Sequence, residues 1–226
     1  GNRVGIYGDV SNFSFYFGHH ITTIEGGMVC TNDSELWDYA KLFRSHGMTR
    51  EASDSLQSEY TENYPELNPL FTFAVPGYNL RNQEMNAVLG LSQLGRMGER
   101  LEYNVKRRKE NFKQWVNNLR YDSDKFYTDF DDNGNSNFAL PLILKEKDLE
   151  LFEKCCILLN NEKVEYRIGT AGGGNQARQP YLEKYKFSMY DLSNVDHIHD
   201  FGLYIGNHPE LSFYEIDRLA RRLCEL

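Results

Sequence analysis

Polar residues that could carry chemistry gather near the N-terminus, in a stretch that reads Phe13-Ser14-Phe15-Tyr16-Phe17-Gly18-His19-His20-Ile21-Thr22-Thr23-Ile24-Glu25-Gly26-Gly27. The aromatic residues predict a buried strand, and the polar residues after them predict a tight loop. Enzymes of the α/β class place reactive side chains at strand ends. Ser14 could bond an anion, and His19 or His20 could act as a general acid or base near neutral pH. A turn with hydrogen-bonded histidines remains the alternative interpretation.

Strands and a helix are predicted around this loop. The residues at 12–17 and 27–31 are dense in apolar and aromatic side chains, which favours two short strands. Asn32-Asp33-Ser34 is a helix start signal, and apolar residues at helical spacing extend that helix to about Gly47. Residues 48–76 are polar and contain three prolines, so we expect a long loop there.

The rest of the chain predicts a helical region followed by a small mixed domain. The expected elements are helix at 82–119, strand at 138–144, helix at 147–161, strand at 164–168, a glycine-rich loop at 171–175, loop then strand at 196–205, and helix at 212–226. Ser212 is the expected N-cap of the last helix, with Glu215 at the capping-box position. The order of elements predicts one domain at 1–119, including a long connecting helix, and a small α+β domain at 120–226.

Composition narrows the class of protein. The chain has 226 residues, of which 40% are hydrophobic, and a formal net charge of -8. This acidity argues against nucleic acid as a partner, because non-specific binding needs a broad basic surface. No apolar run approaches the roughly 20 residues that span a bilayer. The four cysteines, Cys30, Cys155, Cys156 and Cys224, fit neither a disulfide framework nor a zinc motif, which favours the cytoplasm.

Several motifs together resemble a known family. In the first stretch, a serine is followed five residues later by His19, and six residues after that by Glu25-Gly26-Gly27. Further matches are Phe43-Arg44-Ser45-His46-Gly47, Gly77-Tyr78-Asn79-Leu80-Arg81, Glu84, and Ala87-Val88-Leu89-Gly90-Leu91-Ser92-Gln93-Leu94. This pattern resembles the DegT/DnrJ/EryC1/StrS family of sugar-nucleotide aminotransferases. These are pyridoxal phosphate (PLP) enzymes of fold type I.

The resemblance implies an α/β architecture: the C-terminal part of a fold-type-I large domain, plus a small α+β domain. In the family, the turn that anchors the cofactor phosphate and the aspartate that faces the cofactor ring lie upstream of the matched motifs. We therefore expect this chain, which begins at Gly1 without an initiating Met, to be the C-terminal part of a longer protein.

His19 stands where the family has its reactive lysine. An imidazole cannot make the covalent link that a lysine amine makes with PLP. The resemblance therefore implies noncovalent PLP or pyridoxamine phosphate (PMP). It also implies the family branch that carries this loop, the sugar-nucleotide 3-dehydratases of deoxysugar biosynthesis. These remove the C3 hydroxyl of a 4-keto-6-deoxy hexose; a GDP-linked sugar is the nearer resemblance and a CDP-linked sugar the next. His19 would carry protons, and glutamate would regenerate PMP.

The resemblance also implies roles for other residues. Ser14 would contact the cofactor phosphate. Asn79 would reach that phosphate from a neighbouring subunit, which implies a homodimer with a shared site. Arg81 would clamp a carboxylate or phosphate, with a surface ion pair as the alternative. His20 and Arg178 would help to bind the nucleotide-sugar, His20 chiefly by shaping the loop.

Three alternatives stay open. One is a metal site in the group formed by His197, His199, His208, Asp196 and Asp200, in which His197 and His199 could share one strand face. It lacks a third ligand at a recognised spacing, so no metal is expected. An aminotransferase of the same family is disfavoured by the missing lysine. A catalytically inactive binding or oligomerisation module with the same fold is the remaining alternative.

Overall fold

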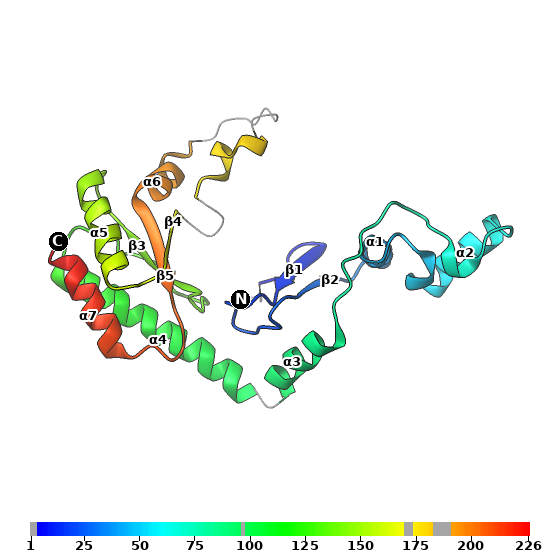
Figure 1. Cartoon of the computed structure of the whole chain (residues 1–226), viewed down its shortest axis with the longest axis horizontal. Coiled ribbons are helices and arrows are strands. Elements are labelled where there is room, and N and C mark those ends of the chain that lie inside the picture. Colours follow the sequence, from blue (N-terminus) through cyan, green and yellow to red (C-terminus); the bar gives the residue numbers. More distant parts are fainter. Residues whose placement is uncertain (1–3, 96–97, 170–173, 183–190) are drawn as a thin grey trace. The chain divides into compact units, whose positions relative to one another are not determined.

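The computed structural model describes residues 4–95, 98–169, 174–182 and 191–226, which form two compact units. The first unit is Gly1–Gly98 and the second is Glu99–Leu226. Each unit has its own helices and strands (Figure 1).

The first unit is built on a two-stranded antiparallel sheet. Strand β1 (Val10–Ser14) pairs with β2 (Gly27–Thr31), and Ser14 lies opposite Gly27. The predicted second strand is confirmed in its bounds, while β1 begins at Val10 and ends at Ser14 instead of spanning 12–17. The prediction that these strands are buried is wrong within this unit: none of their residues is buried, and Phe13, Met28 and Val29 are exposed, since a two-stranded sheet buries little surface by itself. Helix α1 (Ser34–Arg44) begins as predicted, because the Asp33 carboxylate accepts the first free backbone N–H groups of the helix.

The long loop predicted at 48–76 is wrong in its middle. Helix α2 (Asp54–Asn63) lies there between two 3₁₀ turns, Thr49–Glu51 and Pro69–Phe71. The Ser53 side chain caps α2, and Asp38 of α1 accepts hydrogen bonds from the Ser53 N–H at 2.6 Å and hydroxyl at 2.7 Å. No residue of α2 is buried, and only Leu56 and Tyr60 of its 10 residues are apolar or aromatic, which is too few to show a helical period.

Helix α3 (Glu84–Gly95) leaves much of its apolar surface uncovered within this unit. The exposed side chains on it include Met85, Val88, Leu91 and Leu94, at 71%, 63%, 65% and 53%. Large exposed apolar patches mark contact sites for other proteins, for membranes or for ligands.

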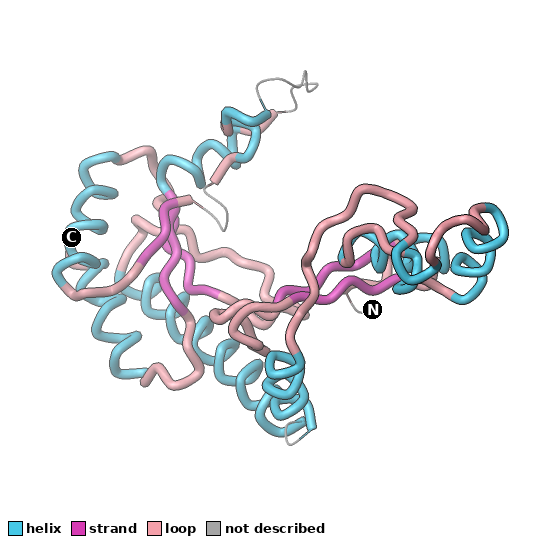
Figure 2. The backbone as a smooth tube through the Cα atoms, turned by 45° about the vertical axis from the view of Figure 1, so that its right-hand side comes forward, coloured by secondary structure: helices cyan, strands magenta, loops and turns pink. Residues whose placement is uncertain are grey.

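The second unit packs helices on a three-stranded antiparallel sheet. Its elements are α4 (Gly98–Asp122), β3 (Ala139–Ile143), α5 (Leu149–Asn161), β4 (Tyr166–Ile168), α6 (Ser193–Phe201), β5 (Gly202–Gly206) and α7 (Phe213–Cys224). The strand order is β3-β5-β4, with β5 central. Figure 2 shows the strands in magenta among the cyan helices. One sheet face is buried through alternate residues, as register pairs Leu140 with Ile205 and Leu142 with Leu203.

The division between units falls after Gly98, whereas the sequence predicted it after residue 119. The reason is that α4 belongs to the core of the second unit. Trp115 is fully buried and its indole N–H donates to the Pro141 carbonyl at 2.7 Å, and Leu119 is buried beside it. A helix that contributes such large side chains to one core is part of that domain.

A buried hydrogen-bonded cluster around Asn207, which we call the Asn207 cluster, joins α4 to the stretch between β5 and α7. The Asn207 amide donates to the carbonyls of Arg108 at 3.0 Å and Asn137 at 2.7 Å. Its oxygen accepts from Asn111 at 3.1 Å, and Asn111 also donates to the His208 carbonyl at 3.0 Å. Burial lowers the pKa of Arg108, whose guanidinium donates to the Phe138 carbonyl. The Asn207 cluster fixes where the chain leaves the sheet.

Two further predictions concern the last elements. Ser212 and Glu215 form the predicted capping box at the start of α7, and their side chains bond each other's backbone N–H. The loop predicted to begin at 196 is wrong: helix α6 covers Ser193–Phe201, and only then does β5 begin. The apolar residues of this stretch, Val195, Ile198 and Phe201, are spaced three apart as on one helix face, and the prediction missed this signal.

Candidate active site

The loop that joins β1 to β2, residues 15–26, is a closed structure and will be called the histidine loop. Its base is tied by Phe15 N–H to the Gly26 carbonyl and by Thr23 N–H to the Phe15 carbonyl, both at 2.8 Å. Within it, the His19 N–H donates to the Tyr16 carbonyl at 3.0 Å and forms a turn. A loop held in this way presents its side chains in a fixed geometry.

The predicted residues of the first stretch lie together on this loop and the strand before it. His19 is half-buried, with its ring set edge-on to Tyr16 at 6.3 Å between centroids. His20 is half-buried beside it. Ser14, the last residue of β1, is exposed, and its oxygen accepts a long 3.4 Å bond from the Tyr16 N–H. The Ser14 hydroxyl proton is thus available to an anionic acceptor.

Helix α3 holds the histidine loop through hydrogen bonds from its side chains to the loop backbone. The Gln93 side chain pairs with both backbone groups of Thr22, accepting from N–H at 3.1 Å and donating to the carbonyl at 2.5 Å. Asn86 donates to the Glu25 carbonyl at 2.7 Å. Sequence reasoning missed Asn86 and gave Gln93 no role. Their spacing on one helix face, with Gly90 between them, was the available signal.

Asn79 and Arg81 lie on the segment that leads into α3, and the structure brings these two predicted residues together. Arg81 Nε donates to Asn79 Oδ1 at 3.1 Å, and both side chains are exposed. The segment pairs with the turn after α1, since Asn79 bridges to Ser45 and the Leu80 N–H donates to the Arg44 carbonyl at 2.9 Å.

Two glycines allow that pairing. Gly47 has a φ of +81°, and a Cβ there would overlap the Val75 carbonyl; a Cβ on Gly77 would overlap the Gly47 backbone. The two motifs at 43–47 and 77–81 are therefore one structural unit, which sets the position of the Asn79 and Arg81 side chains.

Arg178 lies in the second unit, where acidic residues of α6 pair with it. Its Nη1 atom is 3.0 Å from Asp200 Oδ1 and 3.5 Å from Asp196 Oδ1. Two carboxylates already neutralise this half-exposed guanidinium, which accounts for Arg178 without a bound anion. Its predicted contact with a nucleotide-sugar stays a prediction. Residues 171–173 of the glycine-rich loop predicted at 171–175 lie outside the described residues.

His197 and His199 lie on helix α6, so the expectation that they share a strand face is wrong. His197 Nε2 is 2.6 Å from the Leu144 carbonyl oxygen, and His199 Nδ1 accepts from the Asn175 N–H at 3.0 Å. Within the described residues, no group of three or more histidine, cysteine, aspartate or glutamate side chains could hold a metal ion.

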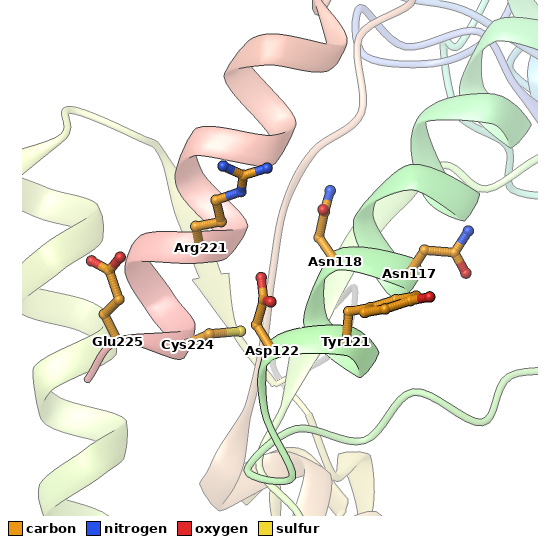
Figure 3. Close-up of a pocket in the computed structure, with 7 residues that line it drawn as sticks. All are labelled: Asn117, Asn118, Tyr121, Asp122, Arg221, Cys224 and Glu225. Atoms are coloured by element: carbon orange, nitrogen blue, oxygen red, sulfur yellow. The ribbon is translucent and has the colours of Figure 1, made fainter.

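A polar cavity of about 530 Å³ opens between the C-terminal ends of α4 and α7 (Figure 3). Asp122 of α4 and Cys224 of α7 face each other across it, and burial together with the Asp122 charge raises the Cys224 pKa to about 11. The remaining lining residues are Asn117, Asn118, Tyr121, Arg221 and Glu225. The cavity contains none of the predicted site residues, and its thiol is held neutral, so it is not the candidate active site.

Comparison with known proteins identifies the family. The sequence profile of the DegT/DnrJ/EryC1/StrS aminotransferase family matches residues 1–224. The chain belongs to this family. The resemblance read from the histidine loop and the motifs at 43–47, 77–81 and 84–94 is thereby confirmed.

Relatives in the DegT/DnrJ/EryC1/StrS family include two enzymes of one name. GDP-4-keto-6-deoxy-D-mannose 3-dehydratase of Escherichia coli O55:H7 is 28% identical over 226 residues, covering 97% of this chain and 55% of the relative. The Yersinia pseudotuberculosis enzyme is 31% identical over 216 residues, covering 92% of this chain and 52% of the relative. This chain thus spans about half the length of the curated relatives it matches.

A solved structure supports the fold. GDP-4-keto-6-deoxymannose-3-dehydratase with a trapped PLP-glutamate geminal diamine superposes with a TM-score of 0.77 at 25% identity, covering 98% of this chain and 56% of that chain. The fold-class prediction, part of a PLP-dependent fold-type-I architecture with mixed helices and sheet, is confirmed. Among the described residues, none of the helices combines the length and apolar character required to cross a membrane.

Proposed function

We propose that the protein carrying this chain is a PLP- or PMP-dependent sugar-nucleotide 3-dehydratase. Its substrate would be a GDP-linked 4-keto-6-deoxy hexose, from which it removes the C3 hydroxyl. The names of the two 3-dehydratase relatives support both the reaction and the GDP-linked substrate. The reaction belongs to deoxysugar biosynthesis, such as the formation of colitose for the lipopolysaccharide O-antigen.

The observation that carries the proposal is His19 on a fixed loop. By motif spacing it takes the position of the family's reactive lysine, and no lysine occurs at 13–27 to replace it. A histidine there cannot hold the cofactor covalently, but its imidazole can accept a proton and return it near neutral pH. That exchange suits the removal of a hydroxyl better than the installation of an amine.

The residues present fit a noncovalent cofactor. Ser14 offers an exposed hydroxyl at a strand end, and Asn79 offers an exposed amide; both can bond a phosphate. When bound, PMP supplies the amine that reacts with the sugar C4 ketone and a conjugated ring that takes up electrons as the C3 hydroxyl leaves.

The chain's own residues would then have separate tasks. His19 accepts a proton at a ring nitrogen and delivers it to the departing hydroxyl oxygen, which leaves as water. His20 shapes the loop around the sugar. Arg81 clamps a substrate carboxylate or phosphate with its planar fork of donors, and glutamate as the amino donor would provide such a carboxylate. Arg178 would contact the nucleotide only after releasing its two aspartates.

Quaternary structure and location complete the proposal. The uncovered apolar side chains of α3 and the exposed Asn79 support a homodimer in which Asn79 serves the neighbouring subunit's site. The four cysteines are free, which supports the cytoplasm as the compartment.

The test uses the protein expressed from its complete reading frame, with PLP, glutamate and the GDP-linked keto sugar. Cofactor absorbance that depends on added PLP or PMP, and a 3-deoxy product, are expected. The variant His19→Asn should retain the bound cofactor and lose dehydration, whereas His19→Lys should link PLP covalently and favour amine transfer. Amine transfer by the natural sequence would identify an aminotransferase. Failure of the natural protein to bind cofactor would identify an inactive module.

A further inference from the structure

Helix α3 presents one polar face to the histidine loop. Asn86, Gly90 and Gln93 are spaced four and three residues apart, so they lie along one side of the helix. Each contacts a different residue of the loop segment 22–25. Thr22 lies 71 residues from Gln93 in sequence, so local chain geometry does not account for the pairing.

The hydrogen bonds from the Gln93 side chain to the loop all go to backbone atoms of the loop. Its carbonyl oxygen accepts from the Thr22 N–H at 3.1 Å, and its amide donates to the Thr22 carbonyl at 2.5 Å. The same amide donates to the Leu89 carbonyl at 3.0 Å, which fixes the side chain on its own helix. The side-chain amide of Gln93 thus bonds both the N–H and the carbonyl of one residue, as the opposite residue does in a pair of antiparallel strands.

Gly90 and Asn86 complete the contact. Gly90 is buried, and a Cβ there would lie 3.1 Å from the methyl carbon of Thr23, itself buried at 4% exposure. Asn86 donates to the Glu25 carbonyl at 2.7 Å, and the Thr23 hydroxyl donates to the same carbonyl at 2.9 Å. The helix therefore bonds the backbone of the loop at Thr22 and Glu25 and packs Gly90 against the Thr23 side chain.

We infer that Gln93, supported by Asn86 and Gly90, is the positioning residue that holds His19 in place for the proposed reaction. The two hydrogen bonds between the Gln93 side chain and the Thr22 backbone, which we call the Gln93 clamp, hold the loop three residues after His19. The backbone hydrogen bond from the His19 N–H to the Tyr16 carbonyl holds the loop on the N-terminal side of His19. Because the clamp contacts backbone, it presents whichever residue stands at position 19 in the same way. This inference rests on the proposed function only for what His19 does.

The test measures loop structure without cofactor or substrate, in the 226-residue chain. Gln93→Met keeps the side-chain length and removes both bonds to Thr22. Amide hydrogen exchange at Thr22, Thr23 and Phe15 should accelerate about tenfold, since two hydrogen bonds are lost. The NMR signals of the His19 ring protons, shifted by the Tyr16 ring, should move toward those of an unstructured histidine.

Matched controls separate the clamp from general damage. Ser92→Ala, on the same helix, removes only a bond to the Leu89 carbonyl and should leave the loop within about twofold of the parent. The Trp115 indole signal reports on the second unit and should be unchanged in every variant. If Gln93→Met unfolds the first unit, the variant Gln93→Glu tests the inference in its place. It keeps an acceptor for the Thr22 N–H but sets an oxygen against the Thr22 carbonyl, so it should still release the loop.

Acceleration confined to Thr22, with Thr23 and the His19 ring unaffected, would overturn the inference, because the loop would then support itself. In the protein from the complete reading frame, Gln93→Met should lower kcat about tenfold and leave the KM for the nucleotide-sugar within about twofold. A loss of clamp signals with normal kcat would show that the loop is held by Gln93 but that His19 is not the reacting group. The two hypotheses therefore fail separately.

Discussion

Replacing Asn207 by alanine should test how the second unit is held together. Asn207 is 2% exposed and makes three hydrogen bonds, two as donor and one as acceptor. Each net bond contributes about 1 kcal/mol, so Asn207→Ala should lower the free energy of unfolding by about 3 kcal/mol. With a urea dependence of about 2 kcal/mol per molar, the midpoint should fall by roughly 1.5 M.

Urea unfolding followed by tryptophan fluorescence measures this change. A Trp37→Phe background leaves the fully buried Trp115 as the reporter for the second unit. Asn160→Ala is the matched control, since Asn160 is exposed and its side chain makes one bond of 3.3 Å, to the Tyr166 hydroxyl. That variant should stay within about 0.5 kcal/mol of the parent. A decrease of less than about 1 kcal/mol in the free energy of unfolding of Asn207→Ala would show that the Asn207 cluster does not stabilise the unit as its number of hydrogen bonds implies.

Three other predictions follow from particular backbone and side-chain positions. Gly47→Ala should make the first unit far more sensitive to proteolysis, because a Cβ overlaps the Val75 carbonyl; Gly134→Ala, with a φ of +73° but open space around it, should cost only about 1 kcal/mol. Burial raises the pKa of Cys155 from 9.0 to about 12, so the unfolded chain loses this proton first. Stability of the second unit should therefore fall as pH rises above 9.0, and urea midpoints in Cys155→Ala should fall less steeply. Ser212→Ala removes the capping hydroxyl of α7 and should lower the free energy of unfolding by about 1 kcal/mol, measured by the same urea titration.

The sequence was most informative where local chemistry alone decides the structure. The capping box of α7 needs only Ser212 and Glu215, and the Asp33 cap of α1 needs only its own first turn. The histidine loop was also found, because its histidines, threonines and glycines contrast with the aromatic residues before them. Each of these signals lies within a few residues of the feature it predicts.

Features that depend on distant partners were missed. Helix α2 buries none of its residues, and its start depends on Asp38 of α1. The place of α4 in the second unit depends on Trp115 meeting Pro141 of β3. The Gln93 clamp joins residues 71 positions apart, so the spacing of Asn86, Gly90 and Gln93 indicates a shared helix face but does not indicate which loop that face contacts. Tertiary contacts of this kind override local propensity.

The most direct test of the central claim is the identity of the sugar product. The protein from its complete reading frame would be incubated with the GDP-linked 4-keto-6-deoxy hexose, PLP and glutamate, and the product analysed by mass spectrometry and NMR. We predict a 3-deoxy-4-keto sugar that has lost its C3 hydroxyl, formed together with free ammonia, and its absence in His19→Asn. A product that keeps the C3 hydroxyl and carries an amine at C4, or undiminished dehydration in His19→Asn, would contradict the account.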